Sequence, residues 1–138
     1  MKAVFVDTAG WVAAADAADP GNGAVRGFRD RWMEEGGVLV TTDYVCDETL
    51  TTLRFRLGLK AAEAWWRQAD GSPRVRFEQV DAARQEKARG IFFRYRDHGF
   101  SFTHCTSFVV MREVGVRRAL TLDEHFRAMG FTTAPGSA

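Results

Sequence analysis

Short apolar runs alternate along this chain with longer segments of helical periodicity. Continuous apolar runs predict buried strands, whereas apolar residues repeated every three to four positions predict helices. The expected strands are residues 2–6, 38–41, 75–80 and 118–121, with a last strand beginning at 132–133. One helix is expected to begin near residue 9, and others to cover residues 24–35, 43–57, 60–69, 81–95, 103–114 and 123–129.

The alternation of strands and helices predicts the fold class. This order is typical of a parallel sheet with helices packed on both faces. We therefore expect an α/β protein, a three-layer α/β/α sandwich with a mostly parallel central sheet. Glycine- and proline-containing breaks at residues 19–23 and 71–73 fit turns between elements. We expect a single domain over residues 1–133, followed by a C-terminal tail over residues 134–138.

Composition and charge are those of an ordinary globular protein. Of the 138 residues, 46% are hydrophobic and 27% charged, and the formal net charge is +1. No long uncharged apolar run is present, so we expect neither a membrane span nor a signal peptide. Cys46 and Cys105 have neither metal-site nor disulfide-framework spacing, which favours a reduced, cytoplasmic setting. Arginine outnumbers lysine, which permits nucleic-acid binding without establishing it.

Polar groups that follow the predicted strands supply the candidate chemistry. Asp7 ends the first strand, Glu48 follows the second and Asp123 follows the fourth, while His104 begins an apolar helix. The carboxyl ends of parallel strands meet at one crevice, so these side chains are expected to gather there. Carboxylates close together favour a hard divalent cation, Mg²⁺ or Mn²⁺, which activates water and stabilises phosphodiester displacement.

Each carboxylate also has a purely structural interpretation. Asp7 and Asp123 suit helix N-caps, and Glu48 suits the solvated face of a helix. The occurrence of all three after apolar strands favours the metal site. Other chemistries find little support, because the chain has no glycine-rich phosphate loop and no G-x-S-x-G elbow. A receiver-like signalling domain is disfavoured as well, since Asp7 stands alone after its strand and no lysine follows Lys87.

Four ordered blocks carry a family resemblance: residues 5–8 (FVDT), 45–50 (VCDETL), 101–108 (SFTHCTSF) and 120–126 (LTLDEHF). They resemble the blocks of PIN-domain proteins, and fit best the VapC-type toxins of bacterial toxin–antitoxin pairs. The resemblance covers the chain from about residue 4 to residue 131 and implies a PIN-like sandwich. It also implies a Mg²⁺- or Mn²⁺-dependent ribonuclease that forms a homodimer and is occluded by a cognate antitoxin.

The resemblance also implies roles for individual residues. Asp7, Glu48 and Asp123 would be catalytic carboxylates and would hold the cation. Thr8 or Ser107 would assist the metal or its water through a hydroxyl. RNA is the implied substrate, and an antitoxin protein and a second copy of the chain are the implied partners.

His104 departs from the family pattern, which has aspartate at this catalytic position. Imidazole suits Mn²⁺, Zn²⁺ or Ni²⁺ better than Mg²⁺, and it removes one negative charge from the site. Three explanations are open. The protein is a toxin inactivated by engineering or by selection during cloning, or it is a natural variant with altered metal preference or weak activity. In the third, another carboxylate such as Asp47 or Asp97 takes the place of the family's aspartate.

Two functions follow from these alternatives. The first is a metal-dependent endoribonuclease toxin of a type II toxin–antitoxin system, impaired by His104. The second is a catalytically inactive PIN-like module that binds RNA or the antitoxin. Metal-dependent cleavage of RNA distinguishes between them.

Several other side chains need an interpretation. His125 lies near the proposed centre, and we interpret it as a surface residue. Trp65 and Phe92 are expected in the core, with Trp66 and Tyr95 at the surface. Core packing accounts for most of the aromatic residues, and the alternative is a dimer face or a groove for an amphipathic antitoxin helix.

Overall fold

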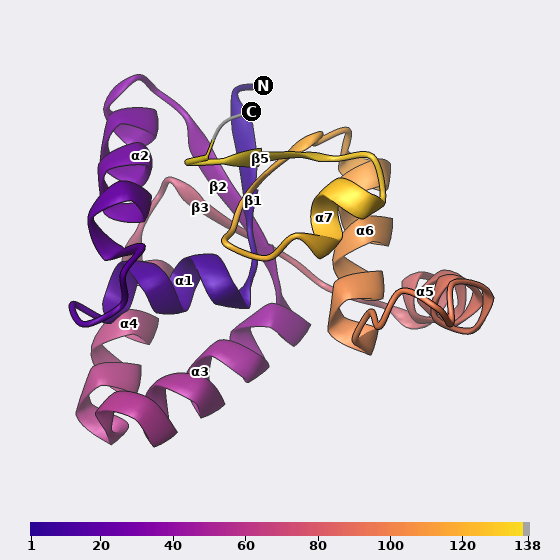
Figure 1. The fold of residues 1–138 in the computed structure, drawn as a ribbon. Helices are drawn as coiled ribbons and strands as arrows, with labels where there is room; N and C mark the ends of the chain where they lie inside the picture. The colour runs from indigo at the N-terminus through magenta and orange to yellow at the C-terminus, as the bar shows by residue number, and fades with distance from the viewer. Residues whose placement is uncertain (137–138) are drawn as a thin grey trace.

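Five strands form one sheet in the computed structural model, which describes residues 1–136 (Figure 1). Their order across the sheet is β3-β2-β1-β4-β5, and all four pairings are parallel. The strands are β1 (Ala3–Val6), β2 (Val38–Thr42), β3 (Val75–Glu78), β4 (Arg118–Leu120) and β5 (Thr132–Ala134). The predicted parallel character of the sheet is confirmed.

The central strand, β1, is apolar on both faces. Val4, Phe5 and Val6 are at most 1% exposed, as expected for a strand covered by helices on both sides. Phe5 pairs with Val40 of β2 and with Ala119 of β4. Because the strands are parallel and in register, the residues that follow them face one crevice.

Helices cover both faces of the sheet. In the described chain they are α1 (Thr8–Ala15), α2 (Asn22–Glu34), α3 (Asp43–Leu57), α4 (Leu59–Gly71), α5 (Ala82–Arg94), α6 (Phe102–Val114) and α7 (His125–Ala128). Figure 1 shows α1, α2 and α4 on one side, α6 and α7 on the other, and α5 outside α6. In the same view α3 runs below the carboxyl ends of β1 and β2. This is the predicted three-layer sandwich.

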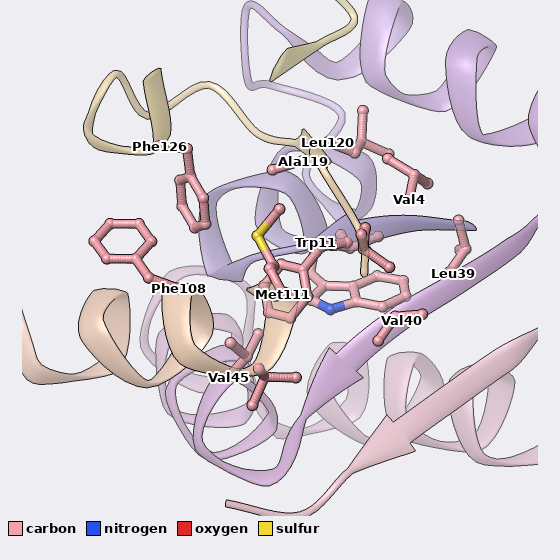
Figure 2. Close-up of a cluster of buried hydrophobic side chains, with 14 of the residues drawn as sticks. Val4, Trp11, Leu39, Val40, Val45, Phe108, Met111, Ala119, Leu120 and Phe126 are labelled. Atoms are coloured by element: carbon pink, nitrogen blue, oxygen red, sulfur yellow. The ribbon is translucent and has the colours of Figure 1, made fainter. Parts of the chain in front are cut away.

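Aromatic and aliphatic side chains from the strands and from the helices around them form the core, and Figure 2 shows part of it. Phe108 of α6 meets Phe126 of α7 edge to face, with ring centroids 5.2 Å apart. On α1, the indole Nε1–H of Trp11 donates to the hydroxyl of Thr41 at the end of β2. The first contact joins α6 to α7, and the second joins α1 to the end of β2.

Gly10 lets α1 approach β4 closely. A Cβ atom at this position would lie 2.2 Å from the backbone carbonyl oxygen of Leu120, so no larger residue fits without a shift of the backbone. The approach holds the first turn of α1 against the end of β4. It thereby brings Asp7 next to the residues that follow β4.

The aromatic predictions are right for the tryptophans and wrong for the other pair. Trp65 is buried and Trp66 is 37% exposed, as expected. Phe92, expected in the core, is 37% exposed, whereas Tyr95, expected at the surface, is half-buried. Both lie at the end of α5, which packs mainly on α6 at the edge of the molecule and therefore leaves much of its apolar surface uncovered.

The C-terminal part differs from the prediction in three details. Ala134, assigned to the tail, belongs to β5, pairs with Leu120 and is fully buried. α6 begins at Phe102, one residue before the expected helix over 103–114, and α7 is shorter than the expected helix over 123–129. Residues 137–138 of the predicted tail lie outside the described residues, and the single-domain assignment stays a prediction.

Within residues 1–136, no helix has both the length and the apolar character needed to cross a membrane.

Candidate active site

A cleft of about 450 Å³ opens at the carboxyl ends of the central strands. Its walls come from the first turns of α1 and α6, one face of α3 and the loop after β4. All six candidate site residues line this cleft: Asp7, Thr8, Glu48, His104, Ser107 and Asp123. The structure thus gathers around one cleft the side chains that were expected to converge.

Asp7 is the most deeply buried of the acids. It is 4% exposed and acts as the N-cap of α1, where its Oδ1 accepts the backbone N–H of Gly10 at 2.8 Å. Its Oδ2 accepts the hydroxyl of Thr121 at 2.8 Å. The structural interpretation of Asp7 as a cap is thus correct, and it does not compete with a role in the cleft, because each carboxylate oxygen keeps a second lone pair.

Burial raises the pKa of Asp7 from its usual 3.8 to about 7. The hydrogen bonds from Gly10 and Thr121 oppose this shift, whereas the negative charges of Asp123 and Glu48 add to it. A buried carboxylate beside two others gains most from a cation that neutralises it. The carboxylates therefore act on one another electrostatically, as a shared binding site requires.

Glu48 and Thr8 form a pair across the cleft. The hydroxyl of Thr8, the first residue of α1, donates to Oε1 of Glu48 on α3 at 2.7 Å. This contact is part-buried and fixes the rotamer of the glutamate while leaving its other oxygen without a protein partner in the described structure. The hydroxyl of Thr8 thus orients a carboxylate, which is one form of the assisting role that the sequence predicted.

Asp123 is held between two histidines. Its Oδ2 lies 2.7 Å from Nε2 of His104, and its Oδ1 accepts the backbone N–H of His125 and lies 2.5 Å from the ring Nδ1 of that residue. Partial burial alone would raise the pKa of Asp123, but the backbone N–H of His125 and the rings of His104 and His125 together lower it. The pKa of Asp123 is therefore lowered whereas that of Asp7 is raised, so Asp123 stays ionised more readily than Asp7.

Hydrogen bonds fix the tautomer of His104. It sits at the third position of α6 and closes a capping box, in which its Nδ1 accepts the backbone N–H of Ser101 at 3.0 Å. The proton of the neutral ring is therefore on Nε2, where it is donated to Asp123. Both ring nitrogens are engaged, so in this arrangement His104 has no lone pair to offer a metal ion.

The remaining candidates are resolved by their positions. Ser107 lines the cleft, is 1% exposed and donates its hydroxyl to the carbonyl oxygen of Thr103 at 3.0 Å. Asp47 and Asp97 are exposed and neither lines the cleft, which removes the geometric basis for placing either in the role of position 104.

Two residues that contact the acids of the cleft were not expected. His125, interpreted as a surface residue, is half-buried and hydrogen-bonded to Asp123. Thr121 donates to Asp7 and accepts the backbone N–H of Asp123 at 2.9 Å, so it links two acids. No distinctive sequence pattern marks either residue, and their contacts with Asp7 and Asp123 appear only in the folded chain.

The donor set fits a hard divalent cation. Three carboxylates face one cleft, and among residues 1–136 no lysine or arginine forms an ion pair with any of them. Oxygen ligands with uncompensated negative charge are what Mg²⁺ and Mn²⁺ prefer. Asp7, Glu48 and Asp123 each retain a lone pair that no hydrogen bond in the described structure uses.

A second group of possible ligands consists of His104, Asp123 and His125, whose ligand atoms all lie within 4.8 Å of one another. Such a set suits a transition-metal ion. Ligation through Nε2 of His104 would move the ring proton to Nδ1 and break the hydrogen bond from Ser101. The hydrogen-bond pattern therefore favours His104 as a partner of Asp123 over His104 as a metal ligand.

Comparison with known proteins gives the chain a family. No family model matches the sequence. The 23S rRNA-specific endonuclease VapC20 of Mycobacterium tuberculosis, from strains CDC 1551 / Oshkosh and ATCC 25618 / H37Rv, is 36% identical over 128 residues, which cover 93% of this chain and 95% of the relative. This chain belongs to the VapC family of PIN-domain toxins. The family resemblance drawn from the four sequence blocks is confirmed.

The fold agrees with this VapC assignment. The crystal structure of Mycobacterium tuberculosis VapC20, a sarcin–ricin loop cleaving toxin, matches with a TM-score of 0.84 at 36% identity. The match covers 94% of this chain and 96% of that chain. The α/β sandwich of this VapC protein is therefore PIN-like, as the sequence predicted.

Proposed function

We propose that this VapC protein is a metal-dependent endoribonuclease, the toxin of a type II toxin–antitoxin pair, which cuts structured RNA. The observation that carries the proposal is the convergence of Asp7, Glu48 and Asp123 on one cleft, where no lysine or arginine of the described structure pairs with them. VapC20, the relative from both strains, is a 23S rRNA-specific endonuclease. This similarity supports ribosomal RNA as the substrate class and the cytoplasm as the place of action.

The three carboxylates would hold Mg²⁺ or Mn²⁺. The bound cation supplies charge stabilisation for the phosphodiester and a lowered pKa for coordinated water. Thr8 holds Glu48 in position through its 2.7 Å hydrogen bond, and Thr121 holds Asp7 in the same way. Ser107, with an acceptor lone pair left on its hydroxyl, is placed to receive a hydrogen bond from water or substrate.

The activity of this chain is proposed to be weak because of His104. An aspartate at this position would add a fourth carboxylate, whereas His104 adds none and donates to Oδ2 of Asp123. That hydrogen bond competes with the cation for one oxygen of Asp123. The same observation favours the second candidate function, a PIN-like module that binds RNA or antitoxin without cutting.

The proposed partners are the RNA substrate, a cognate antitoxin and a second copy of the chain. Exposed aromatic side chains support an interface, since Phe93 is 60% and Phe92 37% exposed at the end of α5. Large exposed apolar groups of this kind commonly mark contact surfaces. We further propose that residues 1–133 and the end of β5 act as one domain.

A cleavage assay on structured RNA with Mg²⁺, with Mn²⁺ and with chelator tests the proposal. We expect slow cleavage that depends on the cation and is lost in Asp7→Asn. Cleavage that is unaffected by chelator would overturn the metal-dependent mechanism. Binding of RNA without cleavage by either this protein or its His104→Asp variant would favour the binding module.

A further inference from the structure

One face of α3 extends the cleft beyond the carboxylates. Glu48, Thr52 and Arg56 all line the cleft and follow one another at intervals of four residues. Residues four apart lie on the same side of a helix. The three side chains, here called the α3 stripe, therefore run about 12 Å along the helix axis, from the candidate metal site toward the rim.

The charge of the α3 stripe changes along its length. Four acids line the cleft, namely Asp7, Asp19, Glu48 and Asp123, and Arg56 is the one arginine or lysine among the lining residues of the described chain. RNA carries a negative charge at every phosphate, so a cleft lined with acids alone would repel it. Arg56 supplies a positive charge beside the path by which the polymer must enter.

Arg56 is not engaged elsewhere in the described structure. It is exposed in the last turn of α3, and the ion pairs among residues 1–136 do not include it. Arg84, in contrast, is held between Glu78 and Glu113. A guanidinium without a carboxylate partner is free to bind two oxygens of one phosphate.

We propose that Arg56 binds a backbone phosphate of the RNA that flanks the cleavage site, and that the strand leaves the cleft along the α3 stripe. The distance of about 12 Å between the two ends of the stripe separates this phosphate from the scissile one. The inference rests on the proposed ribonuclease function and adds the direction of the bound strand. Arg56 is an RNA-binding residue in this account and takes no part in the chemistry.

Arg54 offers a matched control on the same helix. It lies two residues before Arg56, about 200° around the helix, and it is exposed and outside the cleft. Both arginines stand in the last turn of α3, so their loss has the same effect on the helix terminus. Arg54→Gln thus removes an equal charge at nearly the same height but on another face.

The experiment measures binding of a fluorescein-labelled RNA hairpin with single-stranded flanks, by anisotropy, in chelator and at several salt concentrations. We expect Arg56→Gln to weaken binding roughly tenfold, as loss of a charged hydrogen bond does. The slope of log Kd against log salt should fall by about 0.7, as expected for the loss of one phosphate contact on a single strand. Arg56→Lys should keep the slope and lose part of the affinity. Arg54→Gln should match the wild type, and all four proteins should melt at the same temperature.

Equal affinity of Arg56→Gln and the wild type, or equal losses in Arg56→Gln and Arg54→Gln, would overturn the inference. Because binding is measured in chelator, cleavage is not required. A protein that binds RNA through Arg56 but never cuts it would overturn the ribonuclease proposal and leave this inference intact. A protein that cuts RNA while Arg56→Gln binds normally would overturn this inference alone, and absence of any RNA binding at low salt would overturn both.

Discussion

Replacing Asp7 by asparagine is expected to stabilise the fold at neutral pH while it removes a carboxylate from the cleft. Asparagine has nearly the size of aspartate and keeps the Oδ1 atom that caps α1 through Gly10. It removes the negative charge, which burial at 4% exposure disfavours. A buried aspartate that lowers the stability of the fold when it is ionised is explained by a requirement of function, because folding alone would favour a neutral side chain.

The pKa of about 7 sets the size of the effect. Below about pH 4 Asp7 is protonated in both the folded and the unfolded chain, so its charge has no influence on stability. Between about pH 4 and pH 7 the aspartate is ionised in the unfolded chain but still protonated in the folded chain. The free energy of unfolding therefore falls as the pH rises through this interval, by roughly 4 kcal/mol in total. Asparagine loses the hydrogen bond that Thr121 donates, worth about 1 kcal/mol. The net gain of Asp7→Asn is therefore roughly 3 kcal/mol near pH 8 and small near pH 5.

Urea unfolding of both proteins in chelator, across this pH range, provides the measurement. The difference in free energy of unfolding between the variant and the wild type isolates Asp7, because all other titrating groups are shared. We expect this difference to increase with pH and to level off above about pH 7. A difference that is independent of pH, or a variant less stable than the wild type near pH 8, would refute the reasoning about buried charge.

Three further predictions concern the site, the packing and the assembly. His104→Asp should raise Mg²⁺ affinity in calorimetry and increase RNA cleavage, because it adds a carboxylate and frees an oxygen of Asp123; equal affinities would show that position 104 is no part of the site. Gly10→Ala should destabilise the fold by at least about 1–3 kcal/mol in thermal or urea unfolding, because its Cβ would lie 2.2 Å from the Leu120 carbonyl oxygen. Gly23→Ala, which meets nothing within 4 Å, should leave stability unchanged or slightly raised. Light scattering should give the mass of a homodimer, and a monomer at micromolar concentration would count against the proposed interface.

Most of the fold could be predicted from the sequence because its elements have strong local signals. The apolar run of β1 and the heptad-like spacing of Val25, Phe28 and Trp32 in α2 agree with the structure. The convergence of Asp7 and Asp123 was predictable for a different reason, since parallel strands in register must end together, whereas Glu48 reaches the same cleft from α3.

The failures are cases where tertiary contacts outweigh the local signal. Ala134 joins β5 because its backbone pairs with Leu120, which no property of an alanine indicates. Phe92 stays exposed because α5 has little beyond α6 to pack against. His125 was interpreted as a surface residue because a single histidine after an acid has no distinctive pattern, yet its ring reaches Asp123.

The hydrogen bonds of His104 changed the chemical interpretation of the site. From the sequence, an imidazole beside carboxylates pointed to a softer metal ion. In the structure both ring nitrogens are engaged, one by the backbone N–H of Ser101 and the other by Asp123. We therefore propose that His104 weakens the site by engaging Oδ2 of Asp123, which is a different mechanism from a change of metal preference.

Cleavage of a structured RNA by the wild type and by Asp7→Asn, each with Mn²⁺ and with chelator, tests the central claim most directly. We expect slow cleavage by the wild type with Mn²⁺, none in chelator, and none by Asp7→Asn under either condition, although that variant is the more stable protein near pH 8. Cleavage by Asp7→Asn at the wild-type rate, or cleavage by the wild type that persists in chelator, would contradict a metal site built on Asp7, Glu48 and Asp123.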